Sequence, residues 1–243
     1  MSRRRAPGWV PNQHGAWAML ATPLAVGILA SGPAWVHMPL TAFWFLGYFA
    51  FFAAGLWLKA PPRRRPALVP PLHTYAVASA AFGALTLALD PGLLRWAPLF
   101  VAPTAIGLVA SARRDERSLW SGLATSIGSS LMVLVAYDAG SGTDWERAWL
   151  LTGILAAYFA GTVLYVKTMI RERGDERFHW LSALAHGAAT VAMTGVDPWL
   201  VLVFALLTIR AAALPAYRLS PKAVGIGEVV ATVVVATTAL LVT

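Results

Sequence analysis

Long apolar stretches alternate with short polar breaks along the whole chain. A helix that crosses a membrane needs about 20 predominantly apolar residues, within a range of about 17–25. Nine stretches are close to this length, and they cover residues 15–31, 39–58, 74–89, 93–111, 119–137, 148–168, 179–195, 198–214 and 223–242. Because the breaks between them are short, a count of eight or ten helices also fits the pattern. The pattern predicts an all-α polytopic membrane protein of about nine transmembrane helices, with residues 1–243 in a single integral membrane domain.

The composition supports this prediction. Charged residues make up 12% of the 243 residues and apolar residues 58%, with a mean hydropathy of +0.64. A soluble domain carries about 25% charged residues, whereas positions that face lipid must be apolar. The chain has no cysteine, which excludes disulfides, thiolate metal sites and cysteine nucleophiles.

The distribution of basic residues predicts the orientation in the membrane. A net charge of +8 would suggest nucleic acid for a soluble protein, but in a membrane protein basic residues collect on cytoplasmic loops beside anionic lipids. With nine helices and a cytoplasmic N-terminus, 17 of the 19 Lys and Arg residues lie inside, the exceptions being Arg95 and Arg147. We therefore expect an external C-terminus, contact with membrane lipids and no nucleic-acid partner.

The chain also shows signs of an internal repeat. A shift of about 107 residues aligns Gly15 with Gly122 and, one position out, Lys59 with Lys167. The same shift aligns the Asp-Pro pair at 90–91 with the pair at 197–198. This predicts two parallel four-helix halves, about 14–112 and 121–219, related by an axis along the membrane normal, with an extra helix at about 223–242. Coincidence in an Ala- and Leu-rich sequence is the alternative.

Three ionisable residues lie inside predicted spans at least four positions from either end. They are His186, Arg210 and Glu228. Such residues are costly in a membrane and usually serve a function or have a partner, so we predict an Arg210–Glu228 pair and assign all three to a substrate-binding site. The alternative is a structural ion pair beside a core histidine.

The polar segment after the sixth span is the most specific loop. Lys167 and Arg171 are four positions apart and so share one helix face, which suits an anionic head group. Glu172, Asp175 and Glu176 follow, and carboxylates of this kind hold Mg²⁺ together with waters and substrate phosphates. A solvated loop with local ion pairs is the alternative.

Two further polar segments lie on the predicted cytoplasmic side. Asn12 and His14 precede the first span and are candidates for ligand contact, or else for a helix cap. The arginines at 63–65 suit phosphate binding, or else orient the chain and contact lipid.

Two resemblances follow from these residues. The segment Asn12-Gln13-His14-Gly15-Ala16-Trp17-Ala18-Met19, with Pro23 after it, resembles the start of the YwiC-like family of bacterial membrane proteins, and residues 165–173 resemble the same family. That family brings no established activity, but it implies a location in the bacterial cytoplasmic (inner) membrane.

The architecture is similar to that of the UbiA-type prenyltransferases. That resemblance implies nine helices, a cytoplasmic N-terminus and two acidic motifs that hold Mg²⁺ and a prenyl diphosphate. The loop at 171–177 resembles the second motif, with Glu172 and either Asp175 or Glu176 as metal ligands. The segment at 59–65, where the first motif would lie, contains no acidic residue.

Three functions remain open at this point. The first is a UbiA-like enzyme, or a degenerate relative without the first motif, that binds an isoprenoid or anionic lipid-like substrate at its cytoplasmic face with Mg²⁺ as a candidate cofactor. The second is a membrane transporter or lipid-binding protein. The third is an assembly partner of a membrane complex.

Overall fold

The structure, a computed structural model, describes residues 8–11 and 16–243. The chain forms two compact units, Met1–Thr143 and Asp144–Thr243, each described here by itself. In the described part of the chain the first unit contains α1 (Ala16–Ser31), α2 (His37–Lys59), η1 (Pro62–Leu68), α3 (Val69–Leu89), η2 (Pro91–Trp96), α4 (Ala97–Ala112), α5 (Leu119–Ser130) and α6 (Met132–Ala139).

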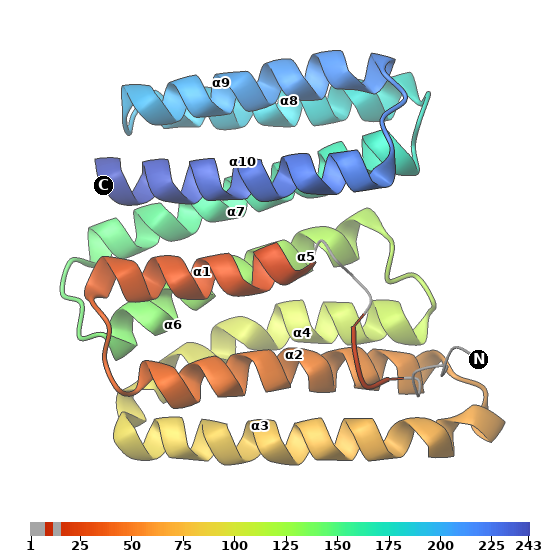
Figure 1. Cartoon of the computed structure of the whole chain (residues 1–243), viewed down its shortest axis with the longest axis vertical. Helices are drawn as coiled ribbons and strands as arrows, with labels where there is room; N and C mark the ends of the chain where they lie inside the picture. Colours follow the sequence, from red (N-terminus) through yellow and green to blue (C-terminus); the bar gives the residue numbers. More distant parts are fainter. Residues whose placement is uncertain (1–7, 12–15) are drawn as a thin grey trace. The chain divides into compact units, whose positions relative to one another are not determined.

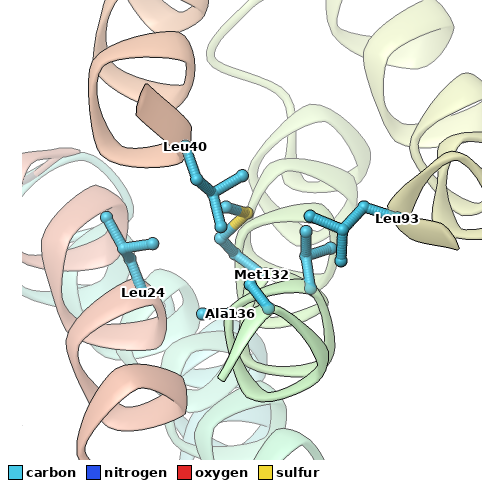
Figure 2. Packing of buried hydrophobic residues seen from close by; sticks show 7 residues of the cluster. Leu24, Leu40, Leu93, Met132 and Ala136 are labelled. Carbon is cyan, nitrogen blue, oxygen red and sulfur yellow. The ribbon is translucent and has the colours of Figure 1, made fainter. Parts of the chain in front are cut away.

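In the first unit α2 lies between α3 and α4, and α1 packs along α5 and α6 (Figure 1). Its core is the place where α1, α2, η2 and α6 meet. Leu24, Leu40, Leu93, Met132 and Ala136 point toward one another there (Figure 2). A buried apolar side chain in such a cluster contributes by close packing, since lipid is as apolar as the core.

One predicted span is broken into two helices. The apolar stretch at 119–137 forms α5 and α6, which separate at Leu131. The turn before the break is rich in serine, with one glycine, and the Ser130 hydroxyl donates to the Ser126 carbonyl at 2.9 Å. Clusters of serine and glycine are a recognised cause of helix kinks, because serine hydroxyls bond to backbone carbonyls of the same helix and glycine leaves the backbone free to bend.

Polar contacts tie the first unit together at both ends of its helices. At one end Asp138 accepts from Arg95 Nε at 3.0 Å and from Trp96 Nε1 at 2.7 Å. At the other, Lys59 forms an ion pair with Glu116 in the loop between α4 and α5. Partial burial opposes ionisation of Glu116, but the Lys59 hydrogen bond and nearby positive charge lower its pKa below the ordinary value.

The second unit contains four long helices. They are α7 (Trp145–Ile170), α8 (Glu176–Met193), α9 (Pro198–Ala213) and α10 (Pro221–Val242), with the short η3 (Leu214–Ala216) before α10. Helix α8 packs beside α9, and α10 contacts both α7 and α9 (Figure 1). An aspartate or serine side chain caps each N-terminus, namely Asp144, Asp175, Asp197 and Ser220.

Within the described residues every apolar stretch predicted from the sequence is helical, which confirms the all-α polytopic fold. Within the described residues, seven helical segments are long and apolar enough to cross a membrane. The two others are α1, which has 16 residues, and α8, whose sequence includes two histidines and an Arg.

The two compact units do not coincide with the predicted repeat halves, because the boundary at Thr143 falls within residues 121–219. The parallel repeat and the single-domain organisation therefore stay predictions.

The close approach of α1 to α6 gives a test of the first unit's packing. A Cβ added at Gly27 would lie 2.7 Å from the Ala136 Cβ and 3.1 Å from the Tyr137 backbone nitrogen. We expect Gly27→Val to lower the free energy of unfolding by about 1–3 kcal/mol, the usual cost of overpacking, in thermal unfolding of the detergent-purified protein.

Gly153→Ala is the matched control. An added Cβ at Gly153 meets nothing within 4 Å, and alanine favours a helix over glycine by up to about 1 kcal/mol. Equal melting temperatures for Gly27→Val and the wild type would show that α1 and α6 do not pack this closely.

Candidate functional site

The candidate site is an ion pair inside the helices of the second unit. Arg210 lies one turn before the end of α9, and Glu228 lies in the second turn of α10. Arg210 Nη1 and Glu228 Oε1 are 2.5 Å apart, and the two side chains are only 16% and 11% exposed. The pair predicted from the sequence is thereby confirmed; its role in binding stays a prediction.

Hydroxyl groups complete the surroundings of the carboxylate. Thr162 on α7 donates to Glu228 Oε2 at 2.9 Å, and the Tyr158 hydroxyl lies 3.4 Å from the same oxygen. Tyr158 is also 2.9 Å from the Thr232 hydroxyl, which in turn donates to the Glu228 carbonyl at 2.7 Å. Both carboxylate oxygens thus have partners, as a buried charge requires.

The sequence analysis gave these hydroxyl residues no role. A usable signal was nevertheless present, because Tyr158 and Thr162 are four positions apart on α7, and so are Glu228 and Thr232 on α10. Residues at this spacing share a helix face, so two polar faces within apolar helices indicated mutual contact.

The guanidinium group is less well satisfied than the carboxylate. Its Cζ lies 4.1 Å from the centre of the Tyr165 ring, a cation–π contact. Arg210 Nε and Nη2 are enclosed by protein and have no hydrogen-bond partner among the described residues. Both carboxylate oxygens of Glu228 therefore have hydrogen-bond donors, whereas Nε and Nη2 of Arg210 are donors without an acceptor among the described residues.

A cavity of about 250 Å³ adjoins the pair. Arg210, Glu228 and Tyr165 line it, and the remaining lining side chains, from α9, α10 and the segment between them, are aliphatic or glycine: Val203, Leu206, Leu207, Leu214, Leu219, Ala223, Val224, Gly227, Val230, Ala231 and Val234. Leu206, Val230 and Val234 are also exposed on the outer surface of the unit. The site thus combines a cationic group with an apolar wall.

His186, on α8, lies outside the cavity. Its Nδ1 is 2.8 Å from the Ser182 carbonyl, so Nδ1 carries the proton that is donated. Its Nε2 faces Gly161 of α7, where an added Cβ would come within 2.9 Å. Among the described residues His186 has no hydrogen bond to Arg210 or Glu228 and does not line their cavity.

The basic residues predicted at the end of α7 do not line the cavity either. Lys167 Nζ lies 3.7 Å from Glu172 Oε1, and Arg171 follows the last residue of the helix. Arg173, which sequence reasoning left without a role, donates to the Met169 carbonyl at 2.9 Å and to the Leu219 carbonyl at 3.0 Å. This arginine therefore ties the turn to the start of α10.

The three carboxylates proposed for Mg²⁺ are not grouped. Glu172 faces Lys167, Asp175 accepts from the Phe178 backbone at 3.1 Å as the cap of α8, and Glu176 occupies the first turn of that helix. Nowhere in the described ranges do three His, Cys, Asp or Glu side chains come together as metal ligands. The described residues therefore do not fit the metal. Asn12 and His14 lie outside the described residues.

Comparisons with known proteins place the chain among bacterial relatives. The model of a family described as YwiC-like protein matches residues 10–137, just over half of the chain. A protein of Haemophilus influenzae described as uncharacterised is 29% identical over 233 residues, covering 93% of this chain and 94% of its own length. The uncharacterised protein YwiC of Bacillus subtilis is 29% identical over 174 residues, covering 71% of this chain and 72% of its own length. No solved structure matches the chain.

The ion pair itself can be tested by removing one charge and then both. Glu228→Gln keeps the size of the side chain but leaves Arg210 buried without a counter-charge, which costs about 3–5 kcal/mol in typical proteins. We expect a clear drop in the unfolding temperature for this variant. The double variant Arg210→Gln/Glu228→Gln removes the uncompensated charge and is expected to recover most of the loss.

Both variants are compared in the same detergent by thermal unfolding. A double variant that unfolds at or below the temperature of Glu228→Gln would mean that the charge pair is not what makes Glu228 important.

Proposed function

This chain belongs to the YwiC-like family, and we propose that it binds a prenyl or lipid-like amphiphile with an anionic head group through Arg210. The observation that carries the proposal is the pair of enclosed nitrogens on Arg210 that have no partner among the described residues, because Arg210 lines a cavity whose other lining side chains, apart from Glu228 and Tyr165, are aliphatic or glycine. A buried guanidinium has a strong preference for oxygen acceptors, and it binds phosphate and carboxylate groups in bidentate fashion.

The geometry assigns each part of the ligand to a part of the site. The anionic oxygens accept from Nε and Nη2, which form one edge of the guanidinium fork. Because both nitrogens are enclosed, side chains at the cavity mouth must move apart to admit the head group. The apolar chain then follows the aliphatic wall toward Leu206, Val230 and Val234 on the outer surface.

Glu228 has a separate task in this proposal. Its oxygens are occupied by Arg210 Nη1, Thr162 and Tyr158, so it holds the guanidinium in place and leaves the far edge for the ligand. One carboxylate against one guanidinium leaves the site neutral without ligand, which limits the cost of keeping it within apolar helices.

The proposal concerns binding and includes no reaction step. A transferase of the UbiA type would need grouped carboxylates for its metal, and the described residues do not provide them. Transport of the bound amphiphile, or a role in assembling a membrane complex, would use the same site, and no feature of the described residues favours either.

We further propose that the N-terminus faces the cytoplasm and the C-terminus the outside of the bacterial cytoplasmic membrane. Support comes from the 17 basic residues that this orientation places inside, against two outside. Relatives in two bacteria are compatible with this membrane.

The absence of cysteine makes the orientation directly testable. Asp115→Cys places a single exposed thiol before α5, and Thr143→Cys places one after α6, so the two thiols lie beyond opposite ends of this pair of helices. We expect an impermeant maleimide to label Thr143→Cys on intact cells and Asp115→Cys only after the membrane is opened. The reverse labelling pattern would invert the proposed orientation.

Ligand binding is tested with farnesyl diphosphate as the probe and farnesol as its uncharged partner. Arg210→Lys keeps a positive charge beside Glu228 but lacks the guanidinium fork. Hydrogen bonds to charged groups are worth about 1.5–3 kcal/mol, so we expect Arg210→Lys to weaken binding of the diphosphate at least about tenfold in calorimetry, and farnesol to bind weakly to both proteins.

Arg177→Lys is the matched control, because Arg177 is exposed in the first turn of α8 and does not line the cavity. We expect it to bind the diphosphate like the wild type. Equal binding of farnesol and farnesyl diphosphate to the wild type, or undiminished binding by Arg210→Lys, would rule out the proposed head-group site.

A further inference from the structure

A second and larger cavity lies among the helices of the first unit. Its volume is about 470 Å³, within the range of small-molecule sites in proteins. All the residues that line it lie in the first unit, on α1, α2, α3, η2, α4, α5 and α6, and none of them is charged. A ligand for this cavity is therefore neutral, because an ion would lose its hydration there without gaining a counter-charge.

Aromatic side chains make up a large part of the wall. They are Phe43, Trp44, Tyr48, Phe51, Trp96 and Phe100. Trp44 and Phe100 meet edge to face, with ring centres 5.9 Å apart. Aromatic walls of this kind bind flat rings well, because ring edges and faces attract each other as well as excluding solvent.

Most polar groups around the cavity are already used by the protein. Trp44 Nε1 donates to the Leu20 carbonyl at 2.9 Å, and Trp96 Nε1 donates to Asp138 at 2.7 Å. The Thr86 and Thr125 hydroxyls donate to carbonyls four residues earlier in their own helices. These groups fix the wall and offer no donor to a ligand.

Tyr48 is different. Its hydroxyl is buried and has no hydrogen-bond partner among the described residues. Tyr48 is one of the residues that line the cavity. Its ring also packs against Trp17, edge-on at 6.3 Å, and against Phe49 at 6.1 Å. A phenol is a better donor than acceptor, so the group that satisfies it best is a carbonyl oxygen.

We propose that this cavity binds a neutral, flat ring compound that carries a carbonyl group, with the carbonyl accepting a hydrogen bond from Tyr48. The rings stack among the aromatic side chains of α2, η2 and α4, and a small turn of the Tyr48 ring brings its hydroxyl to the ligand. This site is independent of Arg210, since it uses residues of the first unit only.

The test uses two probes of nearly the same shape. 2-Acetylnaphthalene has a carbonyl oxygen, whereas 2-ethylnaphthalene has none. Binding to the full-length protein in nanodiscs is measured by calorimetry, with binding to empty nanodiscs subtracted. We expect saturable binding of both probes to the wild type and a preference for the acetyl compound of about fivefold or more, the order expected for one hydrogen bond to a buried donor.

Two variants separate the hydrogen bond from the cavity. Tyr48→Phe removes only the hydroxyl, so we expect the preference to disappear while binding of the ethyl compound is kept. Thr104→Trp places a large side chain at an exposed position of the cavity wall, and we expect it to lower the affinity for both probes. Tyr217→Phe, an exposed tyrosine of the second unit, is the matched control.

These measurements show whether the cavity binds the probes or whether its aromatic residues serve only to pack the helices together. Absence of saturable binding to the wild type, a preference that survives Tyr48→Phe, or wild-type binding by Thr104→Trp would each overturn the proposal. Should Tyr48→Phe fail to fold, the probe preference of the wild type and the loss of binding in Thr104→Trp still test it.

Discussion

A charged side chain within apolar helices has to be neutralised by its neighbours, and the second unit is organised around that requirement. The cost of an isolated charge falls as partners are added. Arg210 and Glu228 bring α9 to α10, and Tyr158 and Thr162 bring α7 to the same carboxylate. A single ion pair therefore specifies how three helices meet, whereas their aliphatic faces alone would allow many registers.

The same requirement explains how hydroxyl groups are used throughout the chain. Backbone groups in a bilayer are satisfied within each helix, so a serine or threonine has to find a carbonyl nearby or a partner on the next helix. Thr86, Thr125 and Ser130 take the first course, each bonding to its own helix. Tyr158 and Thr162 take the second. Ser79 on α3 also takes the second course and donates to the Phe43 carbonyl of α2 at 3.1 Å, so hydroxyls that cross between helices hold helices together with or without a charged group nearby.

The sequence predicted the helices and the ion pair because both follow from strong constraints. Apolar length alone identifies a span, and two opposite charges in neighbouring apolar helices are expected to meet. It did not predict the break at Leu131, since serine and glycine also occur in straight helices. The sequence also did not show that Lys167 lies outside the cavity beside Arg210. Residue spacing predicts which residues share a helix face, but it does not predict which level of that helix a neighbouring helix contacts.

Cavities were the least predictable feature, because they arise from side chains that come from many helices. The lining of the larger one runs from Ala16 to Val135, and no spacing along the chain connects Phe43 with Phe100 or Thr125. The carboxylates at 172–176 do not form the predicted cluster of metal ligands for a related reason. Three acids within five positions are close in sequence, yet a turn directs one toward Lys167 and uses another as a helix cap.

The two cavities favour different ligands for physical reasons. In the second unit the guanidinium has unused donors, and these suit the oxygens of an anionic head group best, because hydrogen bonds between charged groups are stronger than those to a neutral acceptor. In the first unit the lining residues are uncharged, so an anion would lose its hydration without compensation, while a ring with one acceptor meets aromatic walls and a single free phenol. We therefore expect the two proposed ligands to bind without competition, because each would occupy a cavity built from residues of a different unit.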